Sequence, residues 1–398
     1  MSGREFSGFD VDAVAVAVRQ PPIEELRSSA RSRRHRSVAT VAAALLVLAG
    51  LTVVPLTVGR DRAEPADPTR PSPTHSGDFT LTGPDAGVDV WTDGCVLRFA
   101  YTGDRGRSWS DWDAARFEGT RCAGDTTGAP KILNASVLSE RSYLVRDAGQ
   151  QHLSTDYGRT WQDGDAAIVA VPSFPATARP VFCGFTCGAV REPLAVDPSS
   201  GTVYRLSGTA PSWRPLVSLY PAADGSIWAA YQLEGASGST VARSADRGAT
   251  WTTWQVGGDA TLVAVVGLDQ RQGYVLTRTA GGRIRLLRTT DGAKTWRDTD
   301  ADLPAQPHWD LTVGSDGSLL AITAGGGTAS DRTARLLVSR DAGRTFLVAR
   351  EYGPIVGSVC VAPGYAWLFG RAVGSAGEPD HLLLTTDATT WARFTLAP

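Results

Sequence analysis

Several residue types are scarce in this 398-residue chain, and each scarcity excludes a class of function. Met1 is the only methionine, so the chain has no methionine-rich binding surface. Lysine occurs only at Lys131 and Lys294, and the formal net charge is −2, which argues against nucleic-acid binding through bulk positive charge. Histidine is sparse and no C-x-x-C pair occurs, so we expect no metal site and no cofactor.

Cysteine is also infrequent, and its placement indicates an oxidising compartment. The five cysteines are Cys95, Cys122, Cys183, Cys187 and Cys360. Without metal-ligand spacing, disulfides are the natural interpretation. The sequence-local pairings are Cys183 with Cys187 and Cys95 with Cys122, although spacing does not fix the connectivity. One cysteine must be left over.

One apolar segment has the length of a membrane span. The 21 residues Val38–Val58 carry no charge, and at about 1.5 Å per residue they span roughly 30 Å. A dense basic run, 27–36, precedes them, whereas only Arg60 and Arg62 follow. The positive-inside rule then places the N-terminus in the cytoplasm and the rest outside. A cleaved signal peptide is the alternative, but the 37-residue leader is long for one.

The membrane segment divides the chain into four predicted parts. Residues 1–37 form a cytoplasmic tail that is mostly disordered, and 38–58 form one transmembrane helix. Residues 59–79 are rich in Pro, Ser and Thr and read as a stiff linker. Residues 80–398 form an extracytoplasmic domain. We therefore expect a single-pass protein of the cell membrane.

A short pattern recurs through the last of these parts: Ser or Thr, any residue, Asp, any residue, Gly, any residue, Ser or Thr, aromatic. Its Asp, Gly and aromatic positions in the four full copies are Asp104, Gly106 and Trp109; Asp156, Gly158 and Trp161; Asp246, Gly248 and Trp251; and Asp341, Gly343 and Phe346. A fifth copy, with Asp291 and Trp296, has Ala293 at the Gly position. A sixth, with Asp387 and Trp391, is one residue short, and a seventh, 207–213 (SGTAPSW), keeps only the ends.

The spacing of this pattern predicts the fold. The aromatic ends are separated by 38 to 52 residues, which is the length of a four-stranded propeller blade. Short β-rich runs between Gly, Asp and Ser turns agree, and long helical periodicity is absent from 78 to 398. We therefore predict an all-β domain, a seven-bladed β-propeller, with six blades as the alternative if 207–213 belongs to an insertion.

The pattern has a structural rather than a catalytic logic. Asp can accept hydrogen bonds from backbone N–H groups in a tight turn, Gly supplies a positive φ, and the aromatic ring packs on the blade. Ala293 should consequently be strained, or its turn reshaped. We expect these residues to hold hairpins together and to form no reaction site.

The repeat resembles the Asp-box (BNR) repeats of sialidases, sortilin-type receptors, photosystem-assembly propellers and many bacterial surface proteins, over about 80–398. The resemblance implies that each box lies at the turn between the third and fourth strands of a blade. The repeat is specific for the fold and indicates almost nothing about function.

The resemblance raises one enzymatic alternative, a sialidase-type glycoside hydrolase. That activity would imply three arginines that grip a carboxylate, an Asp acid, and a Tyr nucleophile assisted by Glu. The family's Arg-Ile-Pro motif is missing, and Arg191–Pro193 lies after the second box. Arg350, Glu351 and Tyr352 offer suitable residue types, but nothing in the sequence links them to an arginine triad.

Other reaction motifs are also missing, including G-x-S-x-G, H-E-x-x-H and a phosphate-binding Gly loop. The sequence therefore favours a non-catalytic, membrane-anchored propeller that binds a protein or glycan at its face or central channel, and no nucleic acid. An assembly factor for envelope complexes is a further alternative. Most of the tryptophans should serve packing between blades.

Overall fold

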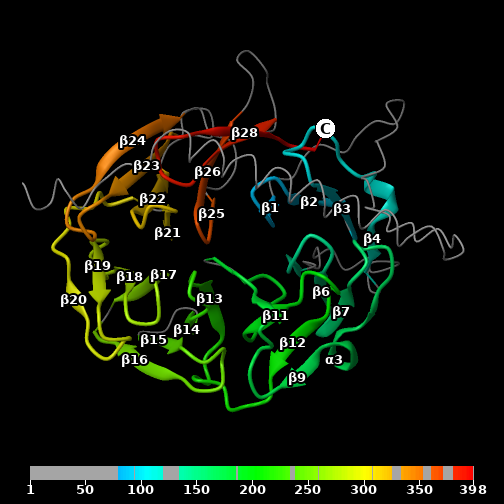
Figure 1. Ribbon diagram of the computed structural model, residues 1–398, viewed down its shortest axis with the longest axis horizontal. Helices are drawn as coiled ribbons and strands as arrows, with labels where there is room; N and C mark the ends of the chain where they lie inside the picture. Colours follow the sequence, from blue (N-terminus) through cyan, green and yellow to red (C-terminus); the bar gives the residue numbers. More distant parts are fainter. Residues whose placement is uncertain are drawn as a thin grey trace, which may run out of the picture. The chain divides into compact units, whose positions relative to one another are not determined.

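In a computed structural model the protein is a ring of seven four-stranded sheets, which confirms the predicted seven-bladed β-propeller (Figure 1). The structure describes residues 79–93, 95–119, 134–184, 187–233, 238–258, 260–306, 308–324, 333–352, 360–370 and 380–397. The chain divides into Met1–Arg60 and Asp61–Pro398, and every described residue belongs to the second unit. Among these residues no helix has the length and apolarity to cross a bilayer. The predicted span 38–58 lies outside them.

Six blades are built from four consecutive antiparallel strands, ordered from the channel outward. Blade 1 contains β1 (Thr80–Leu81), β2 (Gly87–Asp93), β3 (Val96–Thr102) and β4 (Arg116–Glu118). Blade 2 contains β5 (Asn134–Val137), β6 (Tyr143–Asp147), β7 (Gln150–Ser154) and β8 (Gln162–Asp163). Blade 4 contains β13 (Leu216–Pro221), β14 (Ile227–Gln232), β15 (Ser239–Ser244) and β16 (Thr252–Val256). Blade 5 contains β17 (Thr261–Gly267), β18 (Gly273–Arg278), β19 (Ile284–Thr289) and β20 (Arg297–Asp298).

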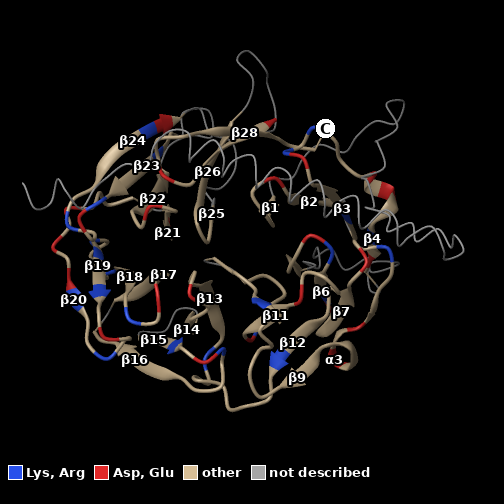
Figure 2. Cartoon of the chain, viewed as in Figure 1, with Lys and Arg blue, Asp and Glu red and all other residues tan. Residues whose placement is uncertain are grey.

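Blades 6 and 7 follow the same plan. Blade 6 contains β21 (His308–Val313), β22 (Leu319–Ala324), β23 (Ala334–Ser339) and β24 (Leu347–Tyr352). Blade 7 contains β25 (Cys360–Ala362), β26 (Tyr365–Gly370), β27 (His381–Thr385) and β28 (Ala392–Thr395). Two short helices, η2 (Trp112–Ala114) and α3 (Gly164–Ala167), complete the described elements. Charged residues of both signs lie on the outer strand β24 (Figure 2).

Blade 3 departs from this plan. Its order is β10 (Arg179–Pro180), β11 (Leu194–Val196), β12 (Val203–Leu206) and β9 (Val169–Val171), and β9 pairs parallel to β12. The seventh predicted repeat, 207–213, is therefore no turn between third and fourth strands, because it follows β12 and leads to β13. Trp213 at its end is 80% exposed. Without a box to turn the chain back, the outer strand comes from an earlier segment.

Large side chains fill the space between neighbouring blades. Trp228 of β14 is fully buried in the core that blades 4, 5 and 6 share, together with Tyr274 and Trp309. Its indole lies against Gly267 and Gly273, where an added Cβ would come within 2.1 Å and 2.7 Å of the ring. The indole Nε1 donates to the Asp269 carbonyl at 3.2 Å. Glycine is thus required where the tryptophan approaches the adjacent backbone.

The ring closes between blade 7 and blade 1 without exchange of a strand. Blade 1 consists of strands from the N-terminal side only, and blade 7 of strands from the C-terminal side only. Thr395 N donates to the Arg105 carbonyl at 3.1 Å, and Trp109 Nε1 donates to the Thr395 carbonyl at 3.3 Å. The rings of Phe79 and Phe394 meet at 5.1 Å between centroids. Side-chain packing and a few hydrogen bonds therefore hold this junction.

Candidate functional site

The six recognisable copies of the repeat, here called box turns, lie at equivalent places in six blades, each between the third and fourth strands. We call the end of the ring with these turns the box end, and the opposite end, with the connections between blades, the connection end. In each of the five longer copies Asp Oδ1 accepts from the backbone N–H four residues on, at 2.9 to 3.0 Å. The same oxygen accepts from the Ser or Thr hydroxyl two residues earlier.

Within each turn the remaining polar groups are also paired. The hydroxyl oxygen of that earlier residue accepts from the N–H at the Gly position, as Ser154 Oγ does from Gly158 at 2.9 Å. Ala293, at the Gly position of the fifth copy, is buried and has a φ of 70°. Its N–H still reaches Thr289 Oγ1 at 3.2 Å. The turn therefore keeps its geometry, and alanine takes up the left-handed conformation that glycine adopts with less strain.

The shorter sixth copy reaches a related arrangement with one residue fewer. Asp387 Oδ1 accepts from Thr389 N at 2.8 Å and from Thr390 N at 2.7 Å. Hydrogen bonds also lower the pKa of the box carboxyls: those from the Thr345 hydroxyl and N–H bring the pKa of Asp341 to about 2. A carboxylate whose acceptor sites are occupied in this way has little capacity left for a ligand, so the boxes act as turn clamps.

Removal of one clamp gives a measurable effect. We expect Asp156→Ala to lower the free energy of unfolding by about 1–3 kcal/mol, because the Thr160 N–H and two hydroxyls lose their acceptor. Urea denaturation of the variant and the wild type measures this difference. Asp302→Ala is the control, since Asp302 is exposed. Equal stability of Asp156→Ala and wild type would refute the clamp role.

Side chains from three blades meet inside the ring near the box end. Tyr220 of β13 donates to Thr312 Oγ1 of β21 at 3.1 Å, since the Thr312 proton goes to the Ala362 carbonyl at 2.7 Å. Val313 N donates to Tyr220 Oη at 3.2 Å. These contacts join blades 4, 6 and 7 across blade 5, so they form a floor across this part of the channel.

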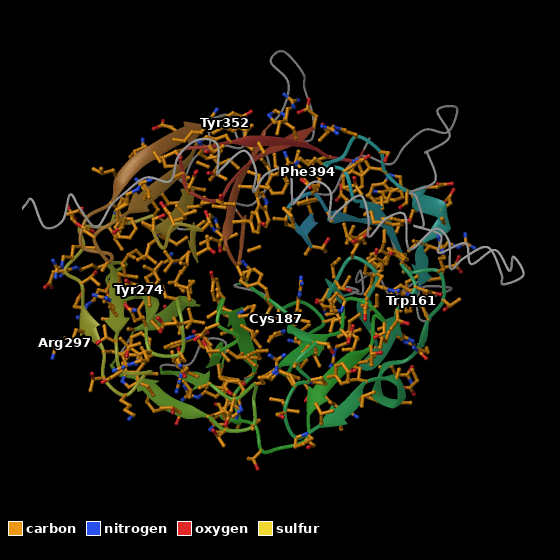
Figure 3. The ribbon with its side chains drawn as sticks, in the orientation of Figure 1. Trp161, Cys187, Tyr274, Arg297, Tyr352 and Phe394 are labelled. Atoms are coloured by element: carbon orange, nitrogen blue, oxygen red, sulfur yellow. A yellow bond between two sulfur atoms is a disulfide. The ribbon has the colours of Figure 1, made fainter. Side chains whose placement is uncertain are left out.

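A disulfide-closed loop reinforces this floor. Cys183 and Cys187 form a disulfide, as predicted, and Cys187 lies toward the centre of the ring, whereas Trp161 and Arg297 lie near its rim (Figure 3). The preceding residue, Phe182, packs edge-to-face on Tyr220 at 6.0 Å and against the cores of blades 6, 7 and 1.

A second predicted disulfide is described in part, since Cys95 is also disulfide-bonded. Its predicted partner Cys122 lies outside the described residues.

The tripeptide that the sequence offered for catalysis is divided among separate contacts. Arg350 stacks on Trp391, with the guanidinium carbon 4.7 Å from the ring centroid, and Glu351 pairs with Arg335 at 2.9 Å. Tyr352 Oη meets His381 Nε2 of blade 7 at 2.7 Å. The three side chains therefore form no common site.

Tyr352, His381 and Asp380 form a hydrogen-bonded chain at the connection end. The buried His381 bonds through Nδ1 to Asp380, and Arg393 lies 3.9 Å from that carboxyl. Burial raises the pKa of Tyr352, with an opposing contribution from Arg393, so the phenol stays protonated and donates to Nε2. A phenol held in this form is a poor nucleophile. The chain ties blade 6 to blade 7.

A second polar group lies between blades 2, 3 and 4. Burial raises the pKa of Glu192, while Arg205 and Arg146 oppose it. Burial also raises the pKa of Tyr231 well above its usual range, and its hydroxyl is enclosed. Arg205 is held by Asp165, at 3.8 Å. A tyrosine that is closed to solvent and only two arginines do not make the carboxylate grip of a sialidase among the described residues.

The connection end of blade 4 exposes apolar surface. Trp213 is 80% exposed, Arg214 stacks on its ring at 5.6 Å, and Leu233 is 40% exposed. Gln232 N donates to the Pro215 carbonyl at 3.0 Å, which brings these two connections together. We call Trp213, Arg214 and Leu233 the blade 4 patch. Trp213 ends the degenerate repeat 207–213, which forms no turn between the third and fourth strands of blade 3.

Comparisons with known proteins return structural likenesses only. No protein-family model and no curated protein sequence matches the chain. A structure of YCF48 bound to a D1 peptide shares 14% identity, covers 84% of this chain and 98% of its own, and has a TM-score of 0.42. The GH74 xyloglucanase from Xanthomonas campestris shares 14% identity over 80% of this chain and 60% of its own, with a TM-score of 0.38.

A prolyl endopeptidase structure shares 12% identity and covers 80% of this chain, with a TM-score of 0.43. The chain spans about half the length of that protein, 50%. Thus the neighbours include one protein in complex with a peptide and others that are enzymes. Likenesses this distant support the fold and indicate no activity.

Proposed function

We propose that this protein is a non-catalytic propeller, anchored in the cell membrane by residues 38–58, that binds a protein or glycan partner at its connection end. The observation that carries the proposal is the blade 4 patch, in which a tryptophan is 80% exposed beside a stacked arginine. Tryptophan and arginine are the residue types that dominate binding energy at protein interfaces, and an exposed indole also stacks on sugar rings.

The chemistry of the described residues supports binding over catalysis. Tyr352 and His381 bond each other between blades 6 and 7, Glu351 pairs with Arg335 within blade 6, and the Tyr231 hydroxyl is enclosed. Within the described ranges no group of three or more His, Cys, Asp or Glu residues has metal-binding geometry. A rigid scaffold that displays exposed aromatic surface fits a binding protein. The hydrolase alternative would require turnover of a fluorogenic sialoside by the purified protein.

The test is capture of a partner by an affinity-tagged full-length chain from envelope extracts. We expect wild type to retain one stoichiometric partner or glycan, and Trp213→Ser to lose at least tenfold of it, because the indole would be a central contact. Val348→Ser is the matched control, since Val348 is 56% exposed on the outer strand β24. Equal capture by wild type and Trp213→Ser would overturn the role of the patch. Recovery of an envelope complex would favour the assembly alternative.

A further inference from the structure

The seven strands that line the channel carry almost no charge. The innermost strands of the seven blades are β1, β5, β10, β13, β17, β21 and β25. Asp310 of β21 is the only acidic residue in them, and Arg179 and His308 are the only basic ones. A single carboxylate between apolar walls concentrates the negative potential at one point.

The pairing of β21 places Asp310 on the channel side. Trp309 and Leu311 pack into the core shared with blade 5. Residues alternate along a strand, so Asp310 lies on the other face with Thr312. Thr312 reaches the Ala362 carbonyl of blade 7 and also Tyr220 of blade 4, beyond blade 5, so this face of β21 borders the inner side of the ring.

The direction of β21 determines where Asp310 lies along the channel. The turn after β21 meets the box turn of blade 7, where Ser315 N donates to the Thr386 carbonyl at 2.8 Å. The strand therefore begins at the connection end with the exposed His308 and ends at the box end. Asp310 lies two residues, roughly 7 Å, above the floor formed by Tyr220 and Thr312.

The Asp310 carboxyl makes no hydrogen bond or ion pair with any residue in the described ranges. Strands β17, β22 and β26, which pack around β21, contain no Asp, Glu, Lys, Arg or His, and neither does β25. His308 is the nearest ionisable residue on its own strand. The side chain is half-buried and its pKa is raised to about 7 by burial. An acceptor that is neither paired nor fully hydrated has capacity for a donor from outside.

We propose that Asp310 binds a cationic donor group, a primary ammonium or a guanidinium, that enters the channel from the connection end and stops at the floor. A single carboxylate with hydroxyls below it suits an organic cation and lacks the ligand number that a divalent metal needs. The group is supplied either by a free polyamine or by a Lys or Arg side chain of a partner. This site is separate from the blade 4 patch, so it goes beyond the proposed partner surface.

Binding of defined amines to the full-length protein tests the proposal. The probes are putrescine, a peptide with one lysine flanked by glycines, and n-butanol as a neutral control, in calorimetric titrations at pH 8. We expect saturable binding of at least one cation and none of butanol. Tighter binding of the peptide would identify a partner side chain as the source, and tighter binding of putrescine a free amine.

Variants and pH connect the binding to this carboxyl. Asp310→Asn should weaken the better probe at least tenfold, Asp310→Glu should keep most of the affinity, and Asp302→Asn should leave it unchanged. In wild type the affinity should fall as the pH is lowered from 8 to 5.5, because only the ionised carboxylate attracts the cation. Absence of binding by wild type, or equal affinity of wild type and Asp310→Asn, overturns the proposal. The pH series on wild type decides the matter if Asp310→Asn fails to fold.

Discussion

Replacement of Trp228 by alanine should lower the free energy of unfolding by about 3–5 kcal/mol, the largest effect that we expect from one side chain. Trp228 is fully buried between blades 4 and 5, its Nε1 is bonded to the Asp269 carbonyl, and its ring meets that of Trp296 edge-to-face at 6.1 Å. The flat cavity that remains would be bounded by Gly267 and Gly273, which have no side chains to fill it. Urea denaturation measures the loss.

Trp213→Ala is the matched control, because it removes the same side chain from a position that is 80% exposed. We expect its effect on stability to stay within about 0.5 kcal/mol. Similar losses from the two variants would show that packing between blades 4 and 5 is not what stabilises the ring. The pair of variants also separates the two roles of tryptophan in this protein.

The second large effect concerns pH. Asp310 has a pKa of about 7 in the folded protein, against an ordinary value of 3.8, because of burial. The unfolded chain therefore releases this proton first as the pH rises, and the folded protein loses stability between pH 4 and pH 7. The full shift corresponds to about 4 kcal/mol, and the partial exposure of the side chain reduces this to about 1–3 kcal/mol.

Asp310→Asn should accordingly raise the free energy of unfolding by about 1–3 kcal/mol at pH 8 and have little effect at pH 4, where the carboxyl is neutral in both states. Urea denaturation at the two pH values measures this. Asp302→Asn should change neither value, as Asp302 is exposed. A loss of stability at pH 8 would mean that the charge is compensated, which would remove the basis for a ligand there. A higher free energy of unfolding for Asp310→Asn at pH 8 would show that Asp310 destabilises the folded protein, as residues of binding sites often do.

The local sequence predicts most of the ring because each box turn is determined by neighbouring residues. Asp156, Gly158 and Thr160 specify a turn within eight residues, and the turn fixes which strands pair. The strand order of blade 3 was not predicted, for the opposite reason. Its parallel pairing joins Val169–Val171 to Tyr204–Leu206, more than thirty residues apart, and no local pattern specifies such a contact.

The candidate sites were harder to predict than the fold. The run His308–Val313 alternates polar and apolar residues like any half-exposed strand, so Asp310 reads as a solvent-facing residue. Only the ring reveals that this face meets the channel and that the surrounding strands carry no charge to pair with it. Likewise, Arg350, Glu351 and Tyr352 are adjacent in sequence, yet the alternation of β24 and its end at Tyr352 direct them to different partners.

The closure of the ring has a mechanical consequence. Because blades 7 and 1 exchange no strand, their junction can part without any sheet being pulled open. Phe79, where the described domain begins, packs against Trp109, Trp367 and Phe394 within that junction. If the preceding residues tether the domain to a membrane, tension on the tether reaches the ring at the junction of blades 7 and 1, which no connecting segment of the chain spans. A bound partner that pulls on the domain would load this joint before it strains any blade.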